Sequence, residues 1–346
     1  MIRIGFWGTG EATGVAAWHA DAFQRDGRAC LAAVYNRTLA RSERWAGQFS
    51  RSIRICRNEQ ELWENSDAVV ICTPNSLHIA QAQAAMQAGC HVLLEKPLCG
   101  NDVQRQSLLD TARQHHVFGA LGYVYRFADP VIQMRKLLRE RFDCLYTVNG
   151  RLGGIRLADP RIPMEWRMRR EIALAGALYD MGSHLVDTAS RVCCQQMEEI
   201  FCQTQTCIGQ RPGKSGRETV ETDDAGSLSG RAGRTIYSMM VSRTGPGPLQ
   251  LTVTGDGGML DLQIGSGLPL CFWEKDRHGG YSSGGPKAVC SGPSIQQEWF
   301  CRQASAFLDG IEGRENAIAG FEEGGYVDRV LAAALRSAQT GRIEAV

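Results

Sequence analysis

The sequence predicts an α/β protein of two domains, the first built on a doubly wound parallel sheet and the second on an open, mostly antiparallel sheet. Three observations support this fold class. Short apolar runs alternate with helical segments in the first third of the chain, and this texture ends near residue 124. The length of 346 residues is about twice a typical domain of roughly 150 residues, although a single large barrel is the alternative at this length.

Six short apolar runs in the first part read as strands, and amphipathic or Ala-rich segments separate them. Because each parallel crossover needs a helix, this alternation predicts a parallel sheet over residues 1–123. The expected strands are 2–7, 30–35, 53–55, 67–73, 91–95 and 117–123. The first expected helix is the Ala-rich segment that ends near Arg25, and the others span 39–49, 58–64, 76–88 and 101–115.

The second domain, residues 124–346, has strand-like runs separated by Gly-rich turns and without crossover helices between them. Such runs predict a largely antiparallel sheet. The expected strands are 146–152 and the apolar runs within 198–275 (IFCQTQTCI, TIYSMMVS, LQLTVTG, MLDLQI and PLCFWEK), and the expected helices are 130–141, 178–192, 295–312 and 321–339.

Composition excludes several classes of protein. With 43% hydrophobic and 22% charged residues the chain is an ordinary folded one, and a net charge of +1 provides no global field for nucleic acid or anionic lipid. No apolar run is long enough to span a bilayer and no apolar signal region follows Met1, so we expect a cytoplasmic protein without nucleic-acid or membrane partners. The 13 cysteines have no metal-site spacing and are expected to be buried thiols, with no metal site.

Lys96 stands out in the charge inventory. Only five of the 38 basic residues are lysines, and Lys96 is the sole lysine before Lys136. Lysine differs from arginine in that it can lose its proton near neutral pH when it is desolvated. This difference marks Lys96 as a candidate catalytic residue before any motif is considered.

A glycine turn, Gly8-Thr9-Gly10, lies between the first expected strand and the first expected helix. A dinucleotide pyrophosphate binds at such a turn, because glycine permits close backbone approach and the helix N-terminus presents free N–H groups. We therefore expect Gly8 to Ala12, including Thr9 and Glu11, to bind a nicotinamide dinucleotide. The third glycine of the usual pattern is replaced by Thr13, with Gly14 one place later.

The end of the second strand normally carries an acid that binds the adenosine ribose and repels a 2′-phosphate. Here the sequence has Asn36 and Arg37, with Arg41 one turn later. A neutral amide and two guanidinium groups favour NADP over NAD at this position. The alternative is that both arginines are ordinary surface residues of an arginine-rich chain.

Four further segments, in this order, resemble the Gfo/Idh/MocA oxidoreductases, the family of glucose–fructose oxidoreductase and inositol 2-dehydrogenase. The resemblance covers nearly the whole chain and implies an N-terminal Rossmann domain and a C-terminal α/β domain whose open sheet often forms an oligomer interface. The matching segments are Asp67–His78 (DAVVICTPNSLH), Glu95-Lys96-Pro97, Trp166-Arg167 and Gly176–His184 (GALYDMGSH), together with the tail segments 321–324 and 337–342.

The resemblance also implies roles for individual residues. It places Lys96 beside the nicotinamide and the reacting carbinol, where an ammonium can stabilise alkoxide character. Asp180 and His184 are four residues apart, which puts both side chains on one helix face, and a carboxylate beside an imidazole suits general acid/base catalysis. The further residues expected at the cofactor are Cys72, Thr73, Pro74, Asn75, His78, Glu95, Pro97, Trp166 and Arg167.

Some residues keep a structural alternative. Trp166 and Arg167 could form a hinge, and Arg126 could contribute to the active site or simply belong to the segment that enters the second domain. The remaining histidines have no partner at ligand or catalytic spacing and are expected to be structural: His19, His91, His115, His116 and His278.

The sequence thus predicts an NAD(P)-dependent oxidoreductase that moves hydride between nicotinamide and a secondary hydroxyl or ketone of a sugar, cyclitol or related polyol. The resemblance also implies a homodimer or homotetramer formed through the C-terminal sheet. Two alternatives stay open. The chain could use a bound NAD(H) transiently for sugar–sugar oxidoreduction or glycoside cleavage, or it could be a non-catalytic cofactor-binding sensor.

Overall fold

A computed structural model describes residues 1–10, 14–50, 52–275, 278–281, 285–291 and 295–346 of the chain. The chain divides into two compact units. The first unit contains Met1–Phe127 and Ile295–Gly325, and the second contains Ala128–Ser294 and Tyr326–Val346. The division predicted between residues 123 and 124 lies close to Phe127, whereas residues 295–325 cluster with the first unit although they follow the second-domain strands in sequence.

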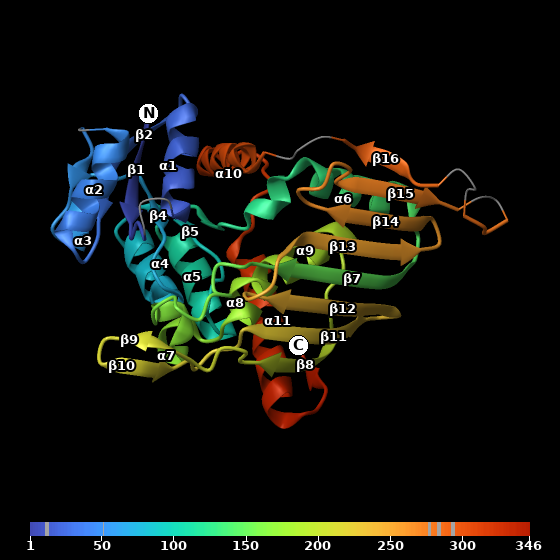
Figure 1. The fold of residues 1–346 in the computed structure, drawn as a ribbon. Helices are drawn as coiled ribbons and strands as arrows, with labels where there is room; N and C mark the ends of the chain where they lie inside the picture. The colour runs from blue at the N-terminus through green and yellow to red at the C-terminus, as the bar shows by residue number, and fades with distance from the viewer. Residues whose placement is uncertain (11–13, 51, 276–277, 282–284, 292–294) are drawn as a thin grey trace. The chain divides into compact units, whose positions relative to one another are not determined.

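The first unit contains a six-stranded parallel sheet of order β3-β2-β1-β4-β5-β6, drawn in blue to green in Figure 1. The six apolar runs predicted from the sequence all form strands, with small differences at their ends. The elements are β1 (Ile2–Trp7), α1 (Val15–Arg25), β2 (Ala29–Tyr35), α2 (Leu39–Phe49), β3 (Arg54–Ile55), α3 (Glu59–Glu64), β4 (Ala68–Ile71), η1 (Asn75–Leu77), α4 (His78–Gln87), β5 (His91–Leu94), α5 (Asp102–Gln114), β6 (Gly119–Leu121), η2 (Val124–Phe127) and α10 (Gln296–Ile311).

The central strands of this sheet are buried on both faces, as expected for parallel strands covered by helices. All four residues of β4 are fully buried, and so are Ile4 and Phe6 of β1. The strand order reverses direction between β1 and β4, because β2 follows on one side of β1 and β4 lies on the other. In sheets of this kind ligands bind at such a point, outside the carboxyl ends of the strands.

Helix α10 packs against α1 through aromatic side chains. Phe23 and Phe307 meet edge to face with ring centroids 6.1 Å apart, and Trp18 stacks on Phe300 at 5.8 Å. This contact explains why residues 295–325 belong to the first unit. Sequence order alone does not predict it, because the contact joins helices that are about 280 residues apart.

The second unit is built on a nine-stranded sheet of order β16-β15-β14-β13-β7-β12-β11-β8-β17 (Figure 1). Its elements are α6 (Asp129–Arg141), β7 (Leu145–Gly153), η3 (Trp166–Met168), α7 (Arg170–Ala173), α8 (Ala177–Asp180), α9 (Gly182–Cys193), β8 (Glu199–Gln205), β9 (Gln210–Gly213), β10 (Gly216–Thr219), β11 (Ala225–Ala232), β12 (Thr235–Ser242), β13 (Gly247–Gly255), β14 (Gly258–Gln263), β15 (Leu270–Glu274), β16 (Lys287–Cys290) and β17 (Glu344–Ala345). Helix α11 (Phe321–Thr340) belongs to the first unit up to Gly325 and to the second from Tyr326.

The pairing in this sheet is mostly antiparallel, which confirms the predicted sheet class. The exception is the central pair of β7 and β12, which is parallel from Thr147/Ile236 to Gly153/Ser242. Helix α9 packs on β7, where Gly150 leaves room for Leu185. The carboxyl ends of β7 and β12 therefore lie together at one edge of the sheet, and the loop that follows β7 leads to α8.

Three findings concern membrane-spanning helices, metal sites and cysteines. No helix in the described part of the chain is long and apolar enough to cross a membrane. Among the described residues no group of three or more His, Cys, Asp or Glu side chains is arranged to hold a metal ion. All 13 cysteines are free thiols, but only five of them are buried; five are half-buried, and the expected burial is wrong for Cys144, Cys194 and Cys207, which are exposed.

Candidate active site

The turn after β1 has the backbone conformation that a dinucleotide-binding turn requires. Gly8 has φ of 79° and Gly10 has φ of 60°, a region that favours glycine. A Cβ atom on Gly8 would lie 2.6 Å from Thr73 Cγ2, whereas one on Gly10 would meet no atom of the described residues within 4 Å. Gly8 thus lets β1 and the loop after β4 approach closely. The predicted cofactor residues Glu11 and Ala12 lie outside the described residues.

Asn36 is tied to this turn by its side chain. The Thr9 N–H donates to Asn36 Oδ1 at 2.9 Å, and Asn36 Nδ2 donates to the buried Ser42 hydroxyl at 3.1 Å. The amide oxygen and one amide hydrogen are therefore already used within the protein. Arg37 and Arg41 are exposed at the same strand end, so a contact with a 2′-phosphate would depend mainly on these two guanidinium groups.

His78 joins the two loops that follow β4 and β5. Its Nδ1 lies 2.7 Å from the Pro97 carbonyl oxygen and its Nε2 lies 3.0 Å from the Thr73 carbonyl oxygen. Burial lowers the pKa of this imidazole, while both carbonyl contacts oppose that change. A neutral ring carries one N–H and can donate to only one carbonyl at a time. His78 is therefore a buried residue that links the loop at Thr73 to the loop at Pro97.

Lys96 is half-buried in the loop directly after β5, between the buried residues Glu95 and Pro97. This loop leaves the carboxyl end of a strand adjacent to β4, on the edge where the glycine turn and Thr73 also lie. Shielding from water and the nearby Glu95 carboxylate raise the pKa of the Cys72 thiol well above its ordinary value. Cys72 therefore stays protonated at neutral pH. The structure brings the glycine turn at Gly8, the loop at Thr73 and Lys96 to one edge of the sheet.

His19 is a partner that the sequence spacing did not reveal. Its Nε2 lies 2.8 Å from Glu95 Oε1, and the imidazole is completely buried in α1. The two residues are 76 positions apart, so only the strand order of the sheet could have signalled their contact. Arg126 likewise proves to be a buried ion-pair residue, with its guanidinium 2.7 Å from Glu323 Oε1.

In the second unit, Asp180 ends α8 and His184 lies in the first turn of α9, so the single helix predicted over 178–192 is interrupted at Met181. Helical hydrogen bonds nevertheless continue through the interruption. The Met181 N–H donates to Ala177 O at 2.9 Å, and the Leu185 N–H donates to Met181 O at 3.1 Å. These bonds keep the helical spacing that puts Asp180 and His184 on one face. The catalytic pairing of Asp180 with His184 remains a prediction.

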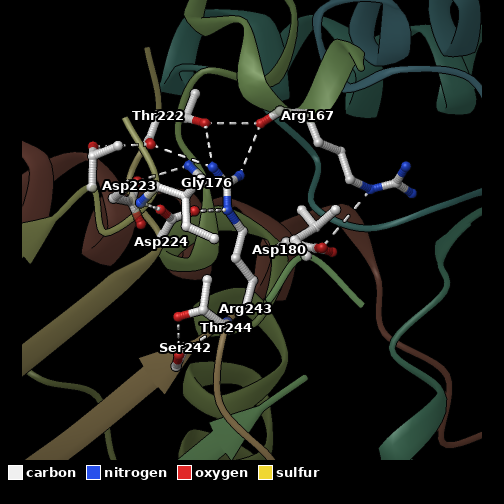
Figure 2. Close-up of polar contacts among 12 residues, drawn as sticks. Arg167, Gly176, Asp180, Thr222, Asp223, Asp224, Ser242, Arg243 and Thr244 are labelled. Atoms are coloured by element: carbon white, nitrogen blue, oxygen red, sulfur yellow. Dashed lines mark hydrogen bonds and ion pairs between the residues drawn. The ribbon is translucent and has the colours of Figure 1, made fainter. Parts of the chain in front are cut away.

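Asp223 holds the turn that leads to Asp180 (Figure 2). Its two carboxylate oxygens accept hydrogen bonds from the Gly176 N–H at 2.7 Å and the Leu178 N–H at 2.8 Å, and its carbonyl oxygen accepts from the Ala177 N–H at 3.0 Å. A Cβ atom on Gly176 would overlap the Asp223 carbonyl oxygen. Only glycine fits at position 176, which gives a physical reason for the first residue of the GALYDMGSH segment.

Next to Asp223 in the chain, Asp224 forms a buried ion pair with Arg243. Arg243 Nε is 2.8 Å from Asp224 Oδ1, and both side chains are almost completely buried. The same guanidinium donates to the Arg167 carbonyl at 3.0 Å and to the Thr222 hydroxyl at 2.9 Å, and that hydroxyl also donates to the Arg167 carbonyl. Figure 2 shows these bonds converging on one arginine. Arg243 was not predicted as a site residue.

Four side chains of alternating charge contact one another in sequence, and Arg167 joins them to this network: Arg156, Glu165, Arg167 and Asp180. Arg156 makes a two-pronged contact with Glu165 at 2.5 and 3.0 Å. Arg167 lies 3.7 Å from Glu165 and 3.9 Å from Asp180, and it stacks over the Trp166 ring at 4.3 Å. The structure thus brings Arg167 and Asp180 together, and the cofactor contacts expected of Trp166 and Arg167 stay predictions.

Comparison with known families agrees with this architecture. Residues 2–123 match the family described as "Oxidoreductase family, NAD-binding Rossmann fold", and residues 131–261 match the "GFO/IDH/MocA C-terminal domain". The two matches follow each other in the order of the two units.

Curated relatives are similar over different parts of the chain. Levoglucosan dehydrogenase of Pseudarthrobacter phenanthrenivorans is 31% identical over 149 residues, which span 43% of this chain but only 38% of that protein. D-glucoside 3-dehydrogenase of Escherichia coli is 25% identical over 80% of this chain and 79% of its own length. A scyllo-inositol 2-dehydrogenase (NADP(+)) of Bacillus subtilis is 29% identical over 35% of this chain and 33% of its own.

Solved structures share the complete fold. Levoglucosan dehydrogenase in complex with NADH and levoglucosan superposes with a TM-score of 0.87 at 20% identity, covering 100% of this chain and 99% of that one. An NAD binding oxidoreductase from Klebsiella pneumoniae gives a TM-score of 0.86 at 24% identity, with coverage of 100% and 99%. At these identities the likeness concerns the fold. The two consecutive family matches and the shared fold show that the chain belongs to the Gfo/Idh/MocA family of oxidoreductases.

Proposed function

We propose that this protein is an NAD(P)-dependent oxidoreductase that transfers hydride between nicotinamide and a secondary hydroxyl or ketone of a sugar, cyclitol or related polyol. The observation that carries the proposal is the position of Lys96. Its loop leaves the carboxyl edge of the parallel sheet beside the glycine turn and the loop after β4, the place where such sheets bind their ligands. The names of the relatives, which include dehydrogenases of sugars and of an inositol, supply the substrate class.

The residues of the first unit fit a nicotinamide dinucleotide. Gly8 and Gly10 have positive φ angles, which suit a turn that approaches a pyrophosphate closely, and a Cβ on Gly10 would meet no atom of the described residues within 4 Å. Arg37 and Arg41 are exposed where the adenosine ribose would bind, and Thr73 to Asn75 follow β4 at the same edge. When bound, the cofactor supplies a hydride acceptor or donor.

The chemistry assigned to the protein follows from its side chains. The Lys96 ammonium donates a hydrogen bond to the reacting oxygen and stabilises the negative charge that develops there. His184, oriented by Asp180, accepts the hydroxyl proton in oxidation and returns it in reduction. Arg167 contacts the Asp180 carboxylate at 3.9 Å and helps to hold it in place.

The test combines a spectrum with an activity screen. The purified protein is scanned for nicotinamide absorbance and then offered sugars and polyols with NAD or NADP, while reduced nicotinamide is monitored. Turnover with exchangeable cofactor supports the proposal. A cofactor that copurifies and does not exchange indicates sugar–sugar oxidoreduction or glycoside cleavage, and binding without turnover of any substrate indicates a sensor.

We also propose that the cofactor site favours NADP. A charge-assisted contact of a guanidinium with the 2′-phosphate is worth about 1.5–3 kcal/mol, or roughly ten- to a hundredfold in affinity. Replacing Asn36→Asp together with Arg37→Ile should therefore shift preference toward NAD by on the order of a hundredfold. The fold tolerates an acid at position 36, because the Ser42 hydroxyl can turn and donate to it. Tighter binding of NAD than NADP by the unchanged protein in a calorimetric titration would refute the preference.

We further propose a homodimer or homotetramer that pairs the exposed faces of the nine-stranded sheet. Two apolar side chains of β12, Ile236 and Met240, are about half exposed on that face. Light scattering coupled to size-exclusion chromatography gives the mass directly. Met240→Lys should lower it to that of one chain, and an unchanged mass would exclude this face.

A further inference from the structure

The buried pair of His19 and Glu95 lies at the base of the Lys96 loop. Glu95 Oε1 is 2.8 Å from His19 Nε2, and Glu95 Oε2 accepts a weaker bond from the Lys96 N–H at 3.3 Å. The imidazole is fully buried and the Glu95 side chain is 11% exposed. One carboxylate therefore connects helix α1, which follows the glycine turn, with the backbone of the candidate catalytic lysine.

The surroundings leave this carboxylate little freedom. A Cβ atom on Gly122 would lie 2.7 Å from Glu95 Oε1, so the backbone directly after β6 closes one side of the carboxylate. The Phe300 ring meets the His19 ring edge to face at 5.0 Å and closes the other side of the imidazole. The pair is held by packing on both sides, and a change at His19 must be transmitted to Glu95.

Burial makes the imidazole necessary. A carboxylate removed from water needs hydrogen-bond donors, and the donors found for it in the described part of the chain are His19 Nε2 and the Lys96 N–H. A carboxylate only accepts hydrogen bonds, so Nε2 carries the proton of this bond, and His19 Nδ1 has no hydrogen-bond partner among the described residues. Without His19 the carboxylate would have to turn toward another donor and would release the Lys96 backbone.

We propose that His19 is a positioning residue: through Glu95 it sets the place of Lys96 relative to the glycine turn. The inference rests on the proposed function of Lys96 in hydride transfer. It adds a residue of α1, outside the matching motifs, to the machinery of the reaction. Since a displacement of about 1 Å can cost a hundredfold in rate, the effect should appear in kcat more than in cofactor affinity.

Three substitutions separate positioning from simple stability. His19→Leu removes the donor and keeps most of the volume. His19→Gln restores a donor, because the glutamine amide nitrogen occupies about the same place as imidazole Nε2. His91→Leu is the matched control: His91 is half-buried at the opposite end of β5, and its Nδ1 accepts a hydrogen bond from the Phe118 N–H at 2.8 Å.

The expected result is a fall in kcat of about ten- to a hundredfold for His19→Leu, with the cofactor Kd changed less than about threefold. His19→Gln should recover most of that loss, and His91→Leu should keep the original kcat although it lowers thermal stability. A kcat of His19→Leu equal to that of the unchanged protein, in preparations where Lys96→Met is inactive, overturns the positioning role and leaves the proposed function standing. Equal losses in His19→Leu and His19→Gln also overturn it.

A second readout does not depend on activity. The five lysines can be dimethylated with 13C-formaldehyde, and the Lys96 signal is identified in NMR spectra by its absence from Lys96→Arg. His19→Leu should shift or broaden the Lys96 signal alone, while His19→Gln and His91→Leu leave it in place. If no substrate turns over, the proposed function fails and this signal still decides the inference. An unmoved Lys96 signal in His19→Leu overturns it.

Discussion

Arg243→Met is the sharpest test of the network behind the Asp180 turn. The substitution keeps the volume of the buried stem but removes the guanidinium, which contacts Asp224 at 2.8 Å and donates to the Arg167 carbonyl and to Thr222. The side chains of Arg243 and Asp224 are 3% and 0% exposed, so water cannot replace the lost partner. Among the described residues, the Asp224 side chain then keeps only the Ile208 N–H as a hydrogen-bond donor, at 2.8 Å.

The size of the effect follows from this burial. Removing one partner of a buried ion pair typically costs about 3–5 kcal/mol, because it leaves an uncompensated charge. The Arg167 carbonyl still accepts from the Thr222 hydroxyl at 2.9 Å, so we add nothing for it. In a unit of about 190 residues each kcal/mol lowers Tm by about 2–4 °C, which predicts a fall of about 6–20 °C.

Thermal unfolding followed by circular dichroism measures this change. The control is Arg231→Met in the same sheet, which removes an exposed pair with Glu199 at 3.5 Å. Exposed pairs contribute about 0–1 kcal/mol, so this variant should unfold within a few degrees of the original protein. Should Arg243→Met also unfold within a few degrees of the original, the argument that the pair holds an uncompensated carboxylate is refuted.

Three further predictions concern single residues. Lys96→Met should keep fold and cofactor affinity but lower turnover by about two or more orders of magnitude, and near-normal turnover would remove Lys96 from the mechanism. His184→Ala should lower turnover comparably and flatten the acid limb of the pH–rate profile, whereas an unchanged profile would reassign the general acid/base. Gly176→Ala should destabilise the protein by about 3 kcal/mol or more in urea unfolding, because its Cβ overlaps the Asp223 carbonyl oxygen and that backbone must move; wild-type stability would contradict the packing.

The parallel sheet could be predicted from sequence because its strands are buried on both faces. Runs such as Ile2–Trp7 and Ala68–Ile71 are nearly continuous in apolar residues, and helices of regular period separate them. Strand β11, in contrast, was not predicted. Its sequence AGSLSGRA lacks β-branched and aromatic residues, yet it lies between β8 and β12. Gly230 fits there because a Cβ would lie 2.9 Å from the Glu199 carbonyl oxygen, a contact that only the folded chain reveals.

The hairpin of β9 and β10 escaped prediction for a different reason. Its strands are polar and short, and Arg211 in β9 is completely buried, which is rare for arginine. The guanidinium donates to the Asp159 carbonyl at 2.7 Å and to the Leu157 carbonyl, and so fixes the loop after β7. Desolvation lowers the pKa of Arg211, but arginine remains protonated. A sequence pattern marks arginine as a surface residue and cannot indicate this role.

Some residues of the candidate site could likewise be predicted from sequence, and others could not. Lys96 could be named from sequence because it is the sole lysine before Lys136, and Asp180 because it lies four residues before His184. The groups that hold them, His19 and Arg243, contact partners that are far away in sequence or belong to loops without periodic pattern. Their positions depend on strand order, which local sequence does not encode.

The double change Arg243→Met with Asp224→Leu separates the effect of the buried pair on stability from its effect on turnover. Replacing both partners of a buried pair by apolar groups is often neutral for stability, although here the Ile208 N–H loses its acceptor at a cost of about 1–3 kcal/mol. The double variant should therefore unfold above Arg243→Met. Both variants lack the guanidinium that donates to the Arg167 carbonyl at 3.0 Å, so we expect the single and the double variant alike to turn over more slowly than the unchanged protein. Recovery of turnover together with stability would mean that the pair serves the fold alone and that Arg167 needs no second donor to face Asp180.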